Sequence, residues 1–129
     1  MQRVTGIGGI FFKVRDMARM AAWYRDNLGI DMEEGFTGRS FRWPDGQTPE
    51  RPGMTVWSLF TQDSAYFDPS TAPFMVNYRV DDLDAMLAQL RGNGAAVDDK
   101  VEEGEFGRFG WVMDPEGNRI ELWQPPAGM

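Results

Sequence analysis

Apolar side chains recur along this chain at regular spacings, and these spacings predict its elements. Residues 10–14, "IFFKV", form a short apolar strand. Asp16 then stands where a helix N-cap belongs, because its carboxylate can accept a free backbone N–H at the helix start. The next apolar residues are spaced three and four apart, as one helix face requires: Met17, Met20, Ala21, Tyr24 and Leu28. Gly29 ends this predicted helix as its C′ residue.

A second strand–helix unit repeats the first one 66 residues later. Its strand is predicted over residues 75–80, its cap is Asp81 or Asp82, and Gly92 or Gly94 ends its helix. The buried face of this helix would comprise Leu83, Met86, Leu87 and Leu90. The residues of the first unit that have a counterpart of similar character at this offset are Phe12, Val14, Asp16 and Met17. Two matching units indicate an internal duplication.

Strand candidates follow both predicted helices. They are "GRSFRWPDG" and "MTVWSLF" in the first half, and "AAVDD", "GRFGWVMD" and "RIELWQ" in the second. The last two are joined by "PEGN", whose residue types favour a hairpin turn. Each half is therefore interpreted as β-α-β-β-β, with modules over about 1–62 and 74–126 and a linker over about 63–73. The turn-rich run "DGQTPERPG" would cover a binding site or contact a second chain.

Period-two alternation assigns the strand residues to two faces. Ile10, Phe12 and Val14 share one face of the first strand, and Ile120 and Leu122 share one face of the last. The helices should cover these aliphatic faces, and the mixed faces would line a more polar surface or cavity. The candidate ligand-binding residues are Phe11, Trp57, Met75, Asn77, Arg108, Trp111, Glu121 and Trp123.

Composition narrows the possible chemistry. The chain contains no cysteine and no histidine, which excludes disulfides, thiolate sites, histidine metal sites and Ser-His-Asp triads. Its net charge of −7 argues against a nucleic-acid partner, because such binding needs cations that neutralise phosphates. The sequence shows neither an apolar run long enough to cross a membrane nor the apolar core of a signal peptide. We therefore expect a cytoplasmic protein.

The duplicated pattern and the ending "DPEGNRIELWQPP" resemble the glyoxalase / bleomycin-resistance / extradiol-dioxygenase superfamily, also called vicinal oxygen chelate proteins. The resemblance extends from "GIFFKVRDM" through "AAWYRDNLGI" to "WVMDPEGNRIELW". It implies an α+β fold in which two β-α-β-β-β modules form a curved mixed sheet around a central pocket. It also implies a homodimer, which would cover exposed sheet edges.

The resemblance places four metal-ligand positions of the superfamily at Gly9, Ser58, Met75 and Glu121. Only Glu121 keeps a residue type that ligates hard divalent cations, since glycine has no side chain and methionine suits soft metals. One carboxylate does not hold such a cation, so we predict neither a metal nor another cofactor.

Three functions remain open from the sequence. The first is metal-independent binding of a small apolar or aromatic molecule between tryptophans and Glu121, as the resemblance to antibiotic-sequestering members implies. The second is a lyase or isomerase of the lactoylglutathione-lyase type, with a metal site elsewhere or with Glu121 as the catalytic base. The third is a partner-binding module whose pocket is filled by side chains.

Overall fold

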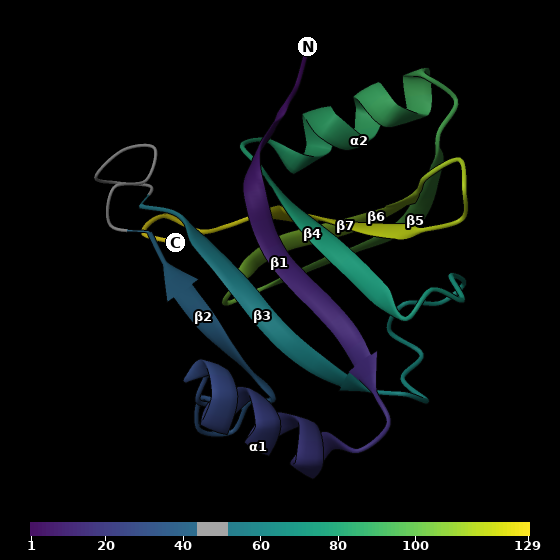
Figure 1. Ribbon diagram of the computed structural model, residues 1–129. Helices are drawn as coiled ribbons and strands as arrows, with labels where there is room; N and C mark the ends of the chain where they lie inside the picture. The colour runs from purple at the N-terminus through teal and green to yellow at the C-terminus, as the bar shows by residue number, and fades with distance from the viewer. Residues whose placement is uncertain (44–51) are drawn as a thin grey trace.

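The described residues form one seven-stranded sheet and two helices (Figure 1). This computed structural model describes residues 1–43 and 52–129, so most of the run "DGQTPERPG" lies outside the described residues. The strand order is β2-β3-β1-β4-β7-β6-β5. The bounds are β1 Val4–Val14, α1 Met17–Leu28, β2 Gly38–Arg42, β3 Met54–Thr61, β4 Phe74–Val80, α2 Leu83–Gly92, β5 Ala96–Gly104, β6 Gly107–Met113 and β7 Arg119–Gln124. No helix in this part of the chain is long and apolar enough to cross a membrane.

The two halves of the sheet meet at β1 and β4, which pair antiparallel. β3 lies parallel to β1, and β7 lies parallel to β4 in the same way, so the duplication is visible in the topology. The predicted α+β fold with a curved mixed sheet is confirmed. The first half has two described strands after its helix where three were expected. Residues 30–37, which the 66-residue offset matches to β5, instead form a turn in which Phe36 N–H donates to the Glu33 carbonyl and Gly35 has a φ of 72°.

Both helices begin at the aspartates that the sequence indicated. The Asp16 carboxylate accepts from Arg19 N–H at 3.1 Å, and the Asp82 carboxylate accepts from Ala85 N–H at 3.0 Å, which decides between Asp81 and Asp82. Gly29 ends α1 in the left-handed conformation, with a φ of 68°. The local capping signals were therefore sufficient to predict both starts.

The sheet has two unlike faces. The helix face carries α2, whose apolar side packs into a core of Val80, Leu83, Met86, Leu87, Val112 and Leu122. α1 packs on the same face more loosely, and none of its residues is buried. The opposite face is called the linker face here, because the linker, residues 62–73, packs on it through Phe67. Its core comprises Phe11, Phe67, Met75 and Trp111.

One edge of the sheet is strongly charged. β5 is the outermost strand beside β6, and most of its residues are exposed. Its charged residues are Asp98, Asp99, Lys100, Glu102 and Glu103. In Figure 1 the helices lie at opposite ends of the view, with β1 and β4 between them. The middle of the helix face is therefore not covered by either helix.

Candidate functional site

Glu121 is the centre of a buried polar cluster on the linker face. It lies in the middle of β7, opposite Asn77 of β4 and Trp111 of β6, and its side chain is 2% exposed. Asn77 Nδ2 donates to Oε1 at 2.7 Å, and Trp111 Nε1 donates to Oε2 at 3.0 Å. The hydroxyl of Tyr66, from the linker, donates to Oε2 as well. Three donors from three segments thus surround this carboxylate.

Burial and hydrogen bonding act on the charge of Glu121 in opposite directions. Burial raises the pKa of the Glu121 carboxyl, and this effect outweighs its three hydrogen bonds and the nearby Arg119 guanidinium, which lower it. Burial and the adjacent carboxylate also raise the pKa of the Tyr66 phenol. Tyr66 therefore keeps its proton at neutral pH and acts as a hydrogen-bond donor to Glu121.

The linker closes this site with two aromatic side chains. The Tyr66 ring stacks on Phe60, with centroids 5.5 Å apart and an interplanar angle of 19°, and meets Trp111 edge-on at 6.4 Å. Phe67 is completely buried beside Phe60, at 5.0 Å between centroids. Tyr66 itself is 37% exposed, so it forms the outer wall of the cluster. The space in front of Glu121 is therefore filled by the chain's own rings.

Cations surround this aromatic cluster. The Arg119 guanidinium lies 4.7 Å from the Trp111 ring and 5.9 Å from the Tyr66 ring, and it donates to the Tyr66 carbonyl. Lys100 lies over the Trp111 ring at 5.5 Å, and Lys13 lies over the Phe67 ring at 5.2 Å. Cations are attracted to the electron-rich faces of aromatic rings, and the contacts of Arg119 with Tyr66 hold the linker against β7.

Most of the predicted ligand-binding residues come together here, and two do not. Buried on the linker face are Phe11, Met75, Asn77, Trp111, Glu121 and Trp123. Trp57 instead lies on the helix face, where its ring meets Tyr24 at 4.9 Å. Arg108 lies outside the cluster and pairs with Asp84 at 2.8 Å and with Glu103 at 3.6 Å.

The candidate residues predicted from the sequence omit three contributors to the site, namely Phe60, Tyr66 and Arg119. Two adjacent aromatic residues in the linker, Tyr66 and Phe67, are the signal from which packing of this segment could be expected. The position of Arg119 two residues before Glu121 places both side chains on one strand face. The hydrogen bond from Tyr66 to Glu121, across 55 residues, had no local signal.

The four metal-ligand positions of the superfamily do not fit a divalent cation in this chain. The register aligns Ser58 with Phe11 and Glu121 with Asn77, so Ser58 is the counterpart of Glu121 in the other half. The Ser58 hydroxyl bonds to a backbone carbonyl, and the space beside Gly9 is taken by the Phe11 ring. Residues 1–43 and 52–129 hold no cluster of three or more acidic, histidine or cysteine side chains. A thioether, a hydroxyl and one carboxylate are a poor donor set for such an ion.

Comparison with known proteins supplies a family and a fold. A family model described as a glyoxalase-like domain matches residues 9–123. A solved variant of the methylmalonyl-CoA epimerase from Streptomyces coelicolor, in complex with 2-nitronate-propionyl-CoA, is 21% identical, with 97% of this chain and 100% of that chain covered and a TM-score of 0.65. The Mycobacterium tuberculosis methylmalonyl-CoA epimerase is 22% identical, with 95% and 89% covered and a TM-score of 0.58.

A third solved structure, described as an NAD-dependent benzaldehyde dehydrogenase from Legionella pneumophila, is 16% identical, with 92% and 98% covered and a TM-score of 0.59. At these identities the three likenesses establish the fold alone. No curated protein matches the chain.

Proposed function

Because this chain belongs to the glyoxalase-like domain family of the vicinal oxygen chelate superfamily, we propose that it binds a small aromatic molecule on its linker face without a metal ion. The observation that carries this proposal is the placement of Tyr66. Its ring stacks on Phe60 while its hydroxyl donates to the buried carboxylate of Glu121. Tyr66 thus occupies a slot that accepts a flat ring with a hydrogen-bond donor.

A ligand of that description could exchange with Tyr66. The side chain belongs to a linker and is the most exposed part of the cluster, so it can leave without disturbing the strands. A stacked ring pair contributes about 0.5–1.5 kcal/mol, and a hydrogen bond to a charged group about 1.5–3 kcal/mol. A phenol or an aromatic amine would recover both contacts. Sequestration of an aromatic antibiotic, as in the bleomycin-resistance members of the superfamily, is one form of such binding.

A catalytic role for Glu121 has weaker support. A general base must reach the proton that it removes, and both oxygens of Glu121 already accept hydrogen bonds at a side chain that is 2% exposed. The closed slot gives better support to a second candidate, a partner-binding module whose site is permanently filled by Tyr66 and Phe67.

Binding of p-cresol tests the slot directly, because this phenol has the shape of the tyrosine side chain. Toluene is the matched compound without the donor. Thermal shift and tryptophan fluorescence would be measured for the natural protein, Tyr66→Ala, and Tyr66→Ala combined with Glu121→Gln. We expect p-cresol to bind Tyr66→Ala at least about tenfold more tightly than toluene, and this preference to fall in the double variant.

The natural protein decides between the two candidates. Binding of flat aromatic antibiotics or other hydroxylated aromatics, with competition by p-cresol, supports the proposed function. If p-cresol binds Tyr66→Ala but no aromatic compound binds the natural protein, the filled partner-binding module is favoured. If p-cresol and toluene bind Tyr66→Ala equally, the assignment of Glu121 as the recognition group is wrong.

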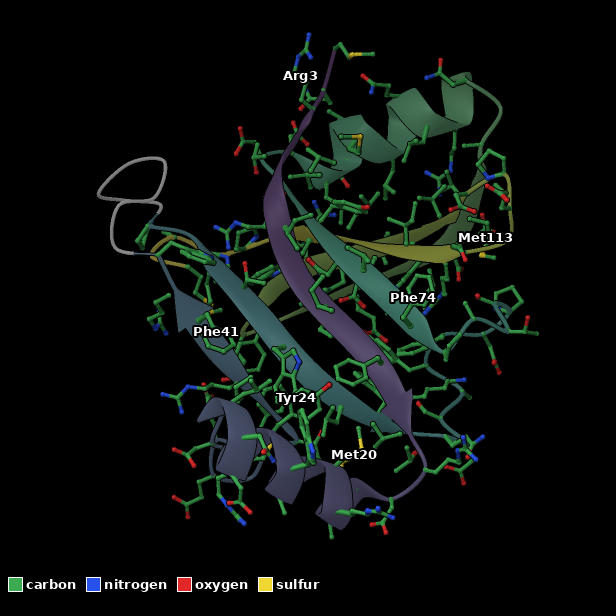
Figure 2. The ribbon with its side chains drawn as sticks, viewed as in Figure 1. Arg3, Met20, Tyr24, Phe41, Phe74 and Met113 are labelled. Atoms are coloured by element: carbon green, nitrogen blue, oxygen red, sulfur yellow. The ribbon has the colours of Figure 1, made fainter. Side chains whose placement is uncertain are left out.

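We also propose that the protein is a homodimer. The supporting observation is the uncovered middle of the helix face, where Ile7, Ile10 and Phe74 are each more than a third exposed. Figure 2 labels Phe74 on β4 in this region. Light scattering should give a mass about twice the 14.7 kDa of one chain, and Phe74→Asp should reduce it. A single-chain mass for the natural protein at high concentration would contradict the proposal.

A further inference from the structure

A separate groove of about 980 Å³ lies at α1, outside the Glu121 cluster. Its walls come from the end of β1, from one side of α1, and from Thr71 and Pro73 of the linker. The linker is held there by a hydrogen bond of 2.7 Å from Lys13 N–H to the Pro73 carbonyl. In Figure 2, Met20 and Tyr24 lie on the side of α1 that faces the sheet. The groove is therefore built from fixed elements on three sides.

Aromatic rings form the apolar part of this groove. Phe12 of β1 meets Tyr24 at 6.0 Å between centroids, and Tyr24 meets Trp23 edge-on at 5.2 Å. Trp23 is 51% exposed, which is unusual for the largest apolar side chain, and it lines the groove. An apolar or aromatic body placed here would cover part of the Trp23 ring.

The charges at the groove are mainly positive in an otherwise acidic protein. Its basic residues are Lys13, Arg15 and Arg19, and Asp16 is the acidic residue among the described side chains that line it. The Lys13 ammonium turns to the Phe67 ring, and the Asp16 carboxylate accepts from the first turn of α1. Neither Arg15 nor Arg19 forms an ion pair with a described residue. As far as the described residues show, two guanidinium groups thus remain for a ligand, although the net charge of the whole chain is −7.

We propose that this groove binds a small amphipathic anion, such as an aryl carboxylate. The ring would lie against Trp23, Tyr24 and Phe12, and the carboxylate would accept from the guanidinium groups of Arg15 and Arg19. Guanidinium matches a carboxylate geometrically, because its planar donors can bond both oxygens at once. Charge complementarity selects the anion over a neutral or cationic molecule with the same ring.

Calorimetric titration with 2-naphthoate tests the proposal, with 2-naphthylmethanol as the neutral compound of the same shape. The variant is Arg19→Gln, and the matched control is Arg25→Gln on the same helix, since Arg25 pairs with Asp26 and does not line the groove. We expect naphthoate to bind about tenfold more tightly than the alcohol and Arg19→Gln to weaken it about three- to tenfold. Arg25→Gln should leave the affinity unchanged.

Four outcomes would overturn the inference. The first is equal binding of the acid and the alcohol, and the second is the same effect of Arg19→Gln and Arg25→Gln. The third is a dimer that seals the groove. In that case the natural protein would sediment as a dimer, Arg19→Gln would sediment as a monomer, and naphthoate would bind neither protein. The proposed function is tested separately through Tyr66→Ala, which should leave naphthoate affinity unchanged. Loss of naphthoate binding in Tyr66→Ala would place this ligand on the linker face and refute the second site.

Discussion

Replacement of Glu121 by glutamine should stabilise the protein at neutral pH, although it removes the carboxylate at the centre of the cluster. Burial raises the pKa of this carboxyl above its ordinary value of 4.5, so the folded state binds this proton more tightly than the unfolded state does. Glutamine is neutral at every pH and has nearly the same shape. Tyr66 and Trp111 can continue to donate to its side-chain oxygen.

The remaining partner can adapt to the new amide. Asn77 now donates to Glu121, and its own Oδ1 has no hydrogen-bond partner in the described part of the chain. A turn of the Asn77 amide would present this oxygen to the NH₂ group of a glutamine at position 121. One buried polar atom stays unpaired before and after the change, so the substitution adds no new unsatisfied group.

The magnitude follows from the linkage between protonation and folding. Because the folded pKa of Glu121 lies above the unfolded value, the folded state binds more protons between the two values. The stability from this group is complete below the unfolded pKa and falls as pH rises through the folded pKa. Its slope approaches about 1.4 kcal/mol per pH unit in that interval. The advantage of Glu121→Gln should therefore be small in acid and should grow towards neutral pH.

Urea unfolding, followed by tryptophan fluorescence from about pH 4 to about pH 8, measures this advantage. The contributions of the carboxylates that both proteins contain cancel when their free energies of unfolding are subtracted at each pH. Glu116→Gln, at an exposed turn position, is the control for loss of one negative charge. The reasoning is refuted if Glu121→Gln lowers the free energy of unfolding by about 1–3 kcal/mol at neutral pH and if this loss is the same at every pH. The hydrogen bonds to Glu121 would then outweigh the cost of its burial.

Two further substitutions test the packing and the closing turn. Gly8→Ala should lower the free energy of unfolding by about 1–3 kcal/mol, because a Cβ at this position would overlap Asn77 Oδ1 and crowd the Trp123 ring. The control is Gly104→Ala, which should change the free energy of unfolding little, because no described atom lies within 4 Å of a Cβ there. Urea unfolding of the two variants measures the difference. Asp114→Ala should lower the melting temperature at neutral pH, because hydrogen bonds from Asn118 hold the pKa of Asp114 below its ordinary 3.8. That contribution is present above the unfolded pKa and is lost as pH falls through the folded pKa, so thermal melts of the two proteins should converge in acid.

Local signals predicted much of the fold. The caps at Asp16 and Asp82 depend on residues within one helical turn, and the face of Glu121 follows from alternation along one strand. The missing strand after α1 shows the limit of the duplication argument. A glycine in the left-handed conformation at Gly35 turns the chain where the second half continues as β5.

The site was harder to predict because it combines segments distant in sequence. Trp57 and Ser58 are adjacent in β3, so period two requires them to lie on opposite faces, and Trp57 cannot share the face of Glu121. The contact between Tyr66 and Glu121 depends on the path of the linker, which the packing of Phe67 under Phe60 sets. No spacing in the sequence encodes that path.

The charged β5 strand has a consequence for how two copies can associate. A twofold axis beside this strand would bring together two copies of a strand that carries one lysine and four acidic residues, namely Asp98, Asp99, Glu102 and Glu103. Like charges directly opposite each other across strands are destabilising, so symmetric extension of the sheet through β5 is disfavoured. We therefore expect a twofold assembly of this protein to form through another surface, such as the face of the sheet, and to leave the β5 edge in solvent.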